Sequence, residues 1–155
     1  MGGVNLNLED LALRGGQRHE CAYTIPLSPV SLGGVEYQLL LPQGVTVSVD
    51  RVAGGYLVGL TTEAKAYGPC FRCLADVEID IRAEQEEFVP TAGGGWAESH
   101  STPFIEGMVV DLSGLAREAV VLAMPERLLC SPLCEGLCAQ CGVDLNRGRC
   151  ECADP

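Results

Sequence analysis

The stretch from Leu128 to Cys152, LLCSPLCEGLCAQCGVDLNRGRCEC, constrains this chain most, because it holds six of the nine cysteines. Within it, Cys138 and Cys141 form a Cys-x-x-Cys that is followed by Gly142, a sequence typical of a zinc knuckle. In such a turn two thiolates bind one ion, backbone N–H groups point at the sulfurs, and glycine leaves room for the tight backbone. The spacing therefore predicts a zinc site.

Two further cysteine pairs flank this knuckle, Cys130 and Cys134 before it and Cys150 and Cys152 after it. A tetrahedral zinc site needs four ligands, so the stretch offers more thiols than one site can use. We expect the knuckle to bind zinc with two of these four cysteines, at least one from each side. The intervening Leu-Asn-Arg-Gly can turn the chain back toward the knuckle.

Two other interpretations of the cysteines were considered. A disulfide framework is typical of small secreted domains, but the N-terminus MGGVNLNLED lacks the basic start and apolar run of a signal peptide, and nine is an odd number of cysteines. A redox Cys-x-x-Cys would be expected as an isolated motif at a helix N-terminus beside a βαβ pattern, which the sequence does not show. Neither alternative fits the sequence as well as a metal site does.

A second Cys-x-x-Cys, Cys70 and Cys73, is expected on a turn between two strands. These residues are either half of a metal site or two reduced thiols packed as small hydrophobic groups. Cys21 lies on the apolar face of an alternating segment and is expected in the core. Setting Cys21 aside leaves eight thiols, enough for two tetrahedral sites, so we expect that Cys70 and Cys73, if they bind metal, share a second site with a pair from the tail.

Alternating hydrophobic segments at 19–27, 35–41, 45–49 and 56–65 predict strands, with no helical segment between them to serve as a parallel crossover. We therefore expect an α+β fold with a mainly antiparallel sheet, a meander or a partly closed β-barrel. The glycine-rich segment 91–103, which contains Trp96, is expected to be a loop. Asp111 should cap one helix, about 111–124, that ends at Pro125 and packs on the sheet. The expected domains are 1–125 and a zinc-binding tail, 126–155.

Charge and hydropathy restrict the partners. The formal net charge is −11 and Lys65 is the one lysine, so the basic surface typical of nucleic-acid binders is missing. The longest wholly apolar run, 119–124, is far shorter than the roughly 20 residues that span a bilayer. We expect a cytoplasmic protein without membrane contact. Arg72, Arg147 and Arg149, close to the cysteines, are the candidate partner-binding residues.

These motifs together resemble a known family. Cys70-Phe-Arg-Cys73-Leu in mid-chain, the run from Cys134-Glu-Gly-Leu-Cys138 to Asn146, and a closing Cys-x-Cys resemble the YceD family of large ribosomal RNA accumulation proteins. The opening VNLNLEDLALRGG is also similar to that of the family. The resemblance covers essentially the whole chain.

The resemblance implies a small cytoplasmic protein, bacterial or plastid-type, that supports normal levels of large-subunit ribosomal RNA without a catalytic activity. It singles out the two cysteine motifs, with Arg72, Gly136, Gly142 and Asn146, as functional positions. The negative charge favours a ribosomal protein or pre-ribosomal particle as partner, with ribosomal RNA contacted indirectly. No small-molecule substrate is expected.

Two alternatives remain beside this hypothesis. One is a zinc-stabilised protein-interaction module unrelated to ribosomes, which co-purification of the tagged protein would distinguish. The other is a zinc enzyme, but catalytic zinc sites keep an open position with about three protein ligands, often histidine, whereas the tail offers cysteines in excess of four. We therefore expect a structural zinc site and no enzyme.

Overall fold

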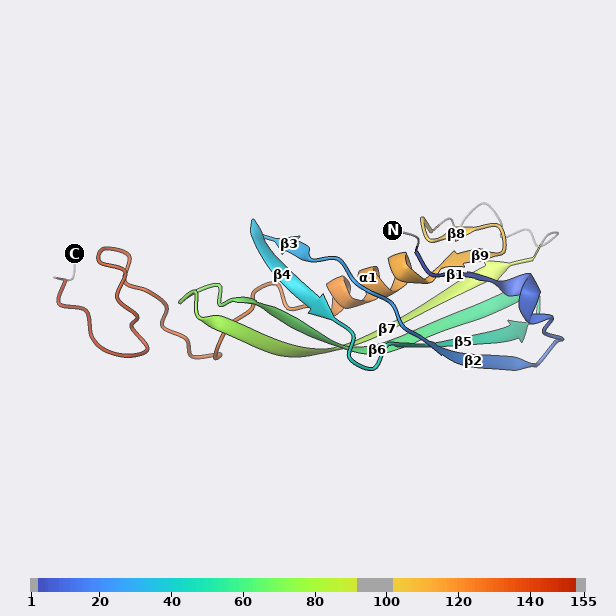
Figure 1. Cartoon of the computed structure of the whole chain (residues 1–155), viewed down its shortest axis with the longest axis horizontal. Coiled ribbons are helices and arrows are strands. Elements are labelled where there is room, and N and C mark those ends of the chain that lie inside the picture. The colour runs from blue at the N-terminus through green and yellow to red at the C-terminus, as the bar shows by residue number, and fades with distance from the viewer. Residues whose placement is uncertain (1–2, 92–101, 153–155) are drawn as a thin grey trace. The chain divides into compact units, whose positions relative to one another are not determined.

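The computed structural model describes residues 3–91 and 102–152 of the chain (Figure 1). The loop expected around Trp96 therefore falls on residues outside those described. Contacts divide the chain into two compact units. Unit 1 comprises residues 1–27, 40–64 and 81–124, and unit 2 comprises residues 28–39, 65–80 and 125–155.

Six strands form the larger sheet, in the order β2-β5-β6-β4-β3, with β7 also paired to β6. Their bounds are β2 Arg18–Tyr23, β3 Val30–Leu32, β4 Val35–Leu40, β5 Val45–Val52, β6 Gly55–Pro69 and β7 Asp76–Pro90. The predicted antiparallel sheet is confirmed in the pairs β2–β5, β3–β4 and β5–β6. Among the described residues this order is neither a simple meander nor a closed barrel, because it leaves β2 and β3 at its two ends.

The core of unit 1 follows from the period-two pattern of its strands. Val45, Val47 and Val49 on β5 are buried and alternate with more exposed residues, and Val58 and Leu60 on β6 are buried in the same way. Successive side chains of a strand point to opposite faces, so one face of this sheet collects the branched aliphatic residues. Burial of this face stabilises unit 1.

A small second sheet belongs to unit 1. Its strands are β1 (Asn5–Asn7), β9 (Val109–Asp111) and β8 (Ile105–Glu106), in the order β1-β9-β8, and a 3-10 helix, Leu8–Leu11, follows β1. The backbone N–H of Leu8 donates to the carbonyl of Met108 at 2.9 Å, which continues this pairing. The N-terminal strand β1 therefore pairs with the segment that leads into the helix.

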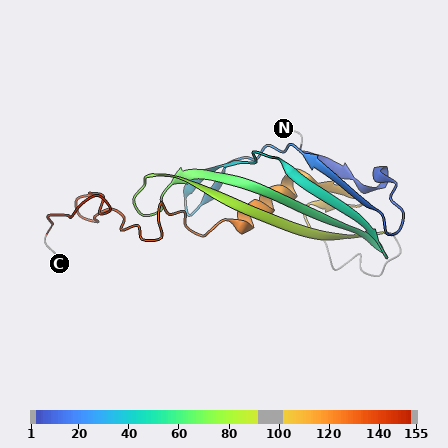
Figure 2. The same cartoon turned by 90° about the horizontal axis from the view of Figure 1, so that it is seen from below.

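The helix α1, Leu112–Ala123, has the predicted position. The side chain of Asp111 caps it by accepting from the backbone N–H of Gly114 at 3.0 Å, and Pro125 follows its last turn. Its buried residues are Leu112, Leu115, Ala116, Ala119 and Val120. Figures 1 and 2 show α1 running along β7, so its apolar face covers the sheet as expected. Among the described residues, no helix is long and apolar enough to cross a membrane.

The expectation that Cys21 lies in the core is wrong. Cys21 pairs with the buried Val47, so both side chains lie on the same face, but the Cys21 side chain is exposed. The reason is that β2 ends the strand order and has a neighbour on one side alone. Pro26 and Pro29 follow β2, and proline, which cannot donate to a ladder, is typical of edge strands and strand ends.

Unit 2 contains the β3–β4 hairpin, the joined ends of β6 and β7, and the tail. The ring of Tyr37 on β4 lies directly over Gly68 on β6, where any Cβ atom would collide with it. In the tail the structure describes a single isolated bridge, between Leu137 and Asp144. The expected division into domains 1–125 and 126–155 remains a prediction. Unit 2 contains the tail together with two earlier segments, 28–39 and 65–80.

Candidate metal centres

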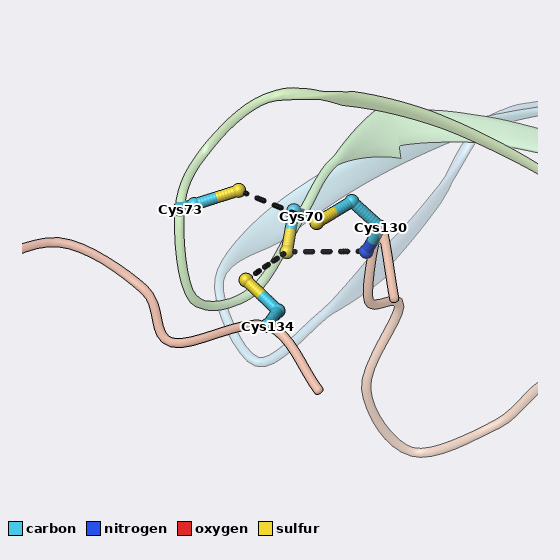
Figure 3. A group of neighbouring side chains, drawn as sticks. All are labelled: Cys70, Cys73, Cys130 and Cys134. Carbon is cyan, nitrogen blue, oxygen red and sulfur yellow. Dashed lines mark hydrogen bonds between the residues drawn. The ribbon is translucent and has the colours of Figure 1, made fainter. Parts of the chain in front are cut away.

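Four thiols of unit 2 converge in what we call cluster 1, which consists of Cys70, Cys73, Cys130 and Cys134. All four sulfur atoms lie within 4.8 Å of one another. The Cys70 and Cys134 sulfurs are 3.8 Å apart, and those of Cys73 and Cys130 are 3.6 Å apart. Figure 3 shows the first two side chains on the turn between β6 and β7 and the other two on the tail, with their sulfurs directed at one another.

Cluster 1 is enclosed by a small apolar core. Cys70, Cys73 and Cys134 are buried, together with Val77. Partly buried aliphatic residues pack against this group: Ile79, Leu129 and Leu137. The backbone N–H of Phe71 also donates to the carbonyl of Leu128 at 2.7 Å, which fixes the tail against the turn. Thiols from two distant stretches of sequence are therefore held together with three of the four cysteines buried and Cys130 exposed.

Four other thiols form cluster 2, which consists of Cys138, Cys141, Cys150 and Cys152, again with all sulfurs within 4.8 Å. The Cys150 sulfur is 3.3 Å from that of Cys138 and 3.4 Å from that of Cys141. Unlike cluster 1, none of these residues is buried, and Cys141 is exposed. Cluster 2 is thus a local site within the tail that is more accessible to solvent.

The two Cys-x-x-Cys turns have the same backbone geometry. In the first, the N–H of Cys70 donates to the carbonyl of Ala75, and the N–H of Leu74 donates to the carbonyl of Cys70, at 2.7 and 3.0 Å. In the second, the N–H of Cys138 donates to the carbonyl of Val143, and the N–H of Gly142 donates to the carbonyl of Cys138, both at 2.9 Å. Residues 74 and 142 therefore hold equivalent positions, and both have positive φ, 61° and 74°. The knuckle turn that was predicted for Cys138 and Cys141 therefore also occurs at Cys70 and Cys73.

Backbone N–H groups point at the first sulfur of each turn, as the knuckle motif predicts. Cys70 accepts from the N–H groups of Arg72 at 3.5 Å and Cys130 at 3.3 Å. Burial raises the pKa of the Cys70 thiol, but the N–H groups of Cys73, Cys130 and Arg72 outweigh this and lower its pKa to about 6. In cluster 2 the N–H groups of Cys141 and Gln140 likewise lower the pKa of Cys138 to about 6.

Contacts between neighbouring thiols have the opposite effect on one cysteine of each cluster, Cys130 and Cys152. The contact with the Cys134 thiol is the largest of several effects that raise the pKa of Cys130 to about 12, and the contact with Cys150 does the same for Cys152. Hydrogen bonds between thiols, burial and nearby charge thus all disfavour ionisation of Cys130 and Cys152 in the absence of a counter-charge. A cation at the centre would remove this penalty.

The donor sets fit a single metal ion. Zinc–sulfur bonds of about 2.3 Å place the four sulfurs of an ideal tetrahedron about 3.8 Å apart. Two sulfur–sulfur contacts in each cluster, at 3.3–3.8 Å, lie close to this value, and all the others are within 4.8 Å. Four thiolates in tetrahedral arrangement are typical of zinc or of iron–sulfur centres. Both clusters could therefore hold a metal ion.

Asn146 connects the two clusters. Its side-chain N–H donates to the Cys134 sulfur at 3.4 Å and to Asp144 at 2.7 Å, and its carbonyl accepts the backbone N–H of Glu135 at 2.8 Å. Asn146 itself follows Cys141 in cluster 2 by five residues, so a residue of the second site donates to a sulfur of the first. Such outer hydrogen bonds orient metal ligands and stabilise the thiolate form.

Arg72 and Gly136 fix the same junction. An Arg72 side-chain N–H donates to the carbonyl of Cys134 at 2.8 Å. Gly136 has a φ of +78°, and a Cβ atom there would lie 3.2 Å from the Arg72 carbonyl oxygen, so a larger residue would push the two loops apart. Three of the positions that the resemblance singled out, Arg72, Gly136 and Asn146, thus lie at this junction.

The structure groups the tail cysteines differently from our expectation. The knuckle thiols Cys138 and Cys141 lie with the two later cysteines, and neither Cys130 nor Cys134 joins them. The earlier pair lies instead with Cys70 and Cys73, as expected if those two share a second site. Gly136, which has positive φ, lies between Cys134 and Cys138 and turns the chain there. Cys130 and Cys134 therefore face the turn at Cys70 and Cys73, while Cys150 and Cys152 face the turn at Cys138 and Cys141.

Comparison with known proteins identifies the family. A family model described as large ribosomal RNA subunit accumulation protein YceD matches residues 58–155, which include all eight cysteines of the two clusters. The chain belongs to the YceD family. The resemblance drawn from the motifs is thus confirmed.

The chain is also similar in sequence to uncharacterised proteins of mycobacteria. Those of Mycobacterium bovis and Mycobacterium tuberculosis H37Rv are 30% identical over 149 residues, which cover 92% of this YceD-family chain and 70% of each relative. That of Mycobacterium leprae is 27% identical over 146 residues, covering 92% of this chain and 67% of the relative. No solved structure matches the chain significantly.

Two features of this YceD-family site were missed from the sequence. The first is the bridge made by Asn146, which the resemblance named without giving it a role. The second is Leu74, a leucine with positive φ at the position where the other turn has glycine. Aligning the two Cys-x-x-Cys motifs with each other would have revealed the second feature, since Leu74 and Gly142 each directly follow the second cysteine of their motif.

Proposed function

We propose that this protein is a non-catalytic assembly factor of the large ribosomal subunit whose unit 2 is organised by two structural zinc ions. Membership of a family described by large-subunit ribosomal RNA accumulation carries this proposal. The two closed sets of four thiols support the structural role, because each set uses every tetrahedral position and leaves none for a substrate. We place the protein in the cytoplasm, where ribosomal precursors assemble.

Zinc is the metal that the geometry favours. Sulfurs that all lie within 4.8 Å of one another suit one central ion, whereas a cluster of several irons would hold its cysteine sulfurs farther apart. The duplicated turn with N–H groups directed at sulfur is the arrangement predicted for a zinc knuckle. Elemental analysis of anaerobically purified protein should give two zinc ions per chain and no iron. One ion per chain, or iron in place of zinc, would contradict this part of the proposal.

The partner we propose is a basic ribosomal protein or a pre-ribosomal particle. The net charge of −11 attracts basic proteins and repels exposed phosphate, so contact with ribosomal RNA would be indirect or limited to the tail. Two of the candidate cations already have a partner within the protein. Arg147 in the tail lies 3.4 Å from Asp144, and Arg72, on the turn between β6 and β7, donates to a carbonyl of the tail. Binding should weaken as salt screens the charges.

A deletion strain tests the function. Loss of the gene should lower large-subunit ribosomal RNA or its precursors relative to small-subunit RNA, and the wild-type gene should restore the ratio. A Cys138→Ser variant should fail to restore it because cluster 2 loses a ligand, while a Cys21→Ser variant, which changes a thiol outside both clusters, should restore it. Balanced RNA levels with a normal ribosome profile in the deletion strain would favour a zinc module unrelated to ribosomes.

A further inference from the structure

Three exposed apolar side chains lie next to cysteines of cluster 1 in the sequence. Leu133 is 85% exposed, Leu74 is 63% exposed and Phe71 is 46% exposed. Each directly neighbours a cysteine of cluster 1 in sequence, so all three are carried on the two loops that the proposed metal would join. Single exposed leucines are common on protein surfaces, but three exposed apolar residues on two loops whose cysteines converge are a candidate contact surface.

The backbone at Leu74 gives an independent reason to connect this surface with binding. Its φ of 61° lies in the left-handed region, where a Cβ atom is strained and glycine is not. The equivalent position in the second turn has Gly142, with the same hydrogen bond to the first cysteine. A glycine would therefore satisfy the turn at position 74 at lower cost. Strain of this kind persists at sites where the side chain serves a function.

The neighbouring loop presents its side chain in a similar way. Leu133 lies in the turn between Cys130 and Cys134, where its N–H donates to the Ser131 side chain at 3.2 Å. The N–H of Cys134 donates to the Ser131 carbonyl at 3.0 Å. The turn is thus fixed by its own hydrogen bonds and by two cysteines of cluster 1, so an apolar side chain on it is held outward at little entropic cost when it meets a partner.

The charge of unit 2 selects the kind of partner. Its three segments contain nine acidic and five basic residues. Two tetrathiolate zinc sites would add about −2 each. Several of the cations are already engaged: Lys65 pairs with Glu78 and Asp80, and the Arg127 guanidinium lies 4.8 Å from the centre of the Phe71 ring. A surface that combines apolar side chains with excess negative charge fits a basic protein and repels a phosphate backbone.

We infer that Leu74, Leu133 and Phe71 form a docking surface around cluster 1 for a basic protein of the large ribosomal subunit. This inference rests on the proposed function and names the surface through which it would act. The metal would hold the two loops in one arrangement, and the leucines would enter apolar pockets of the partner while the excess negative charge of unit 2 attracts its cations. A few buried contacts usually carry most of the binding energy of a protein interface, and charge complementarity sets the choice of partner.

Binding of the zinc-loaded full chain to two defined probes tests the inference. One probe is the protein fraction of purified large ribosomal subunits freed of RNA, and the other is protein-free large-subunit ribosomal RNA. The wild-type chain should retain a basic protein, identified by mass spectrometry, from the first probe. Leu74→Gly and Leu133→Ser should each weaken that retention by about tenfold or more. Leu122→Ser removes a leucine of similar exposure from α1 in unit 1 and should leave it unchanged.

Leu74→Gly is the decisive variant because it should relax the turn and keep both metal sites. If Leu74→Gly bound less zinc than the wild type, Leu74 would be structural and the inference would be overturned. Retention by both variants at wild-type strength, or retention of RNA in preference to protein, would overturn it while leaving the proposed function standing. If the wild-type chain retained neither probe, the inference and the proposed function would both fail.

Discussion

Replacing Asn146 by alanine should weaken metal binding at cluster 1, although Asn146 belongs to the loop of cluster 2. The change removes the amide that donates to the Cys134 sulfur at 3.4 Å and to Asp144 at 2.7 Å, and the oxygen that accepts from Glu135 at 2.8 Å. The backbone N–H of residue 146, which donates to Asp144 at 3.0 Å, would remain. The loop should therefore keep its turn and lose its connection to the first site.

The magnitude follows from the hydrogen bond to sulfur. A hydrogen bond to a charged group contributes about 1.5 to 3 kcal/mol, and the lower part of that range applies here because the amide is partly exposed. A loss of about 1.5 to 2.5 kcal/mol corresponds to a fall of about 10- to 70-fold in metal affinity. Loss of an outer-shell partner lowers metal affinity by a similar factor in other proteins.

Cadmium-113 NMR can separate the two sites, because each bound cadmium gives its own resonance. Titration with a competing chelator should remove the cluster 1 signal from Asn146→Ala at a lower chelator concentration than from the wild type. Gln140→Ala is a matched control, since Gln140 contributes its backbone N–H to Cys138 and that group survives the change. Equal cluster 1 affinity in wild type, control and Asn146→Ala would show that the bridge contributes no energy and would refute this reasoning.

Three further predictions concern stability. Removing the metals with a chelator should expose the backbone of the tail to hydrogen exchange, because the tail lacks an extensive core of its own. The strands β2 and β5 of unit 1 should stay protected. Equal loss of protection in both regions would contradict this. Gly136→Ala should destabilise the tail more than Gly142→Ala, since both have positive φ but only a Cβ at 136 meets the Arg72 carbonyl; chelator competition should rank them in that order. Gly68→Ala should displace the buried Tyr37 ring and cost about 1–3 kcal/mol in thermal unfolding, and an unchanged near-UV circular dichroism signal from tyrosine would argue against the displacement.

The elements with strong local signals could be predicted from the sequence. The alternating valines of β5, the Asp111 cap and the turn at Cys70–Cys73 each depend on a few consecutive residues, so periodicity and capping identified them. Cys21 was misplaced because burial depends on which strand lies at the edge, and strand order is set by contacts that no local pattern contains.

The candidate sites were predictable in part for the same reason. Cysteine spacing identifies which residues can bind a metal, but six tail thiols can be divided among sites in several ways, and spacing alone does not choose among them. What decides in the structure is the backbone between the pairs: positive φ at Gly136 separates Cys134 from Cys138. Leu74 and Asn146 act through a turn conformation and a contact between loops, neither of which has a sequence period.

The two clusters close loops of very different size, and this has a consequence for the order in which they form. Cys150 lies 12 residues from Cys138, whereas Cys134 lies 64 residues from Cys70. Closing the longer loop costs about 1.5 kcal/mol more in chain entropy. Cluster 2 can therefore fill on a chain that is otherwise unfolded, as isolated knuckles do. Cluster 1 can fill only after β6, β7 and the tail have met, and translation delivers its last two ligands about sixty residues after its first two. Metal at cluster 1 would thus mark a completed fold, while metal at cluster 2 would report only that the tail has been synthesised.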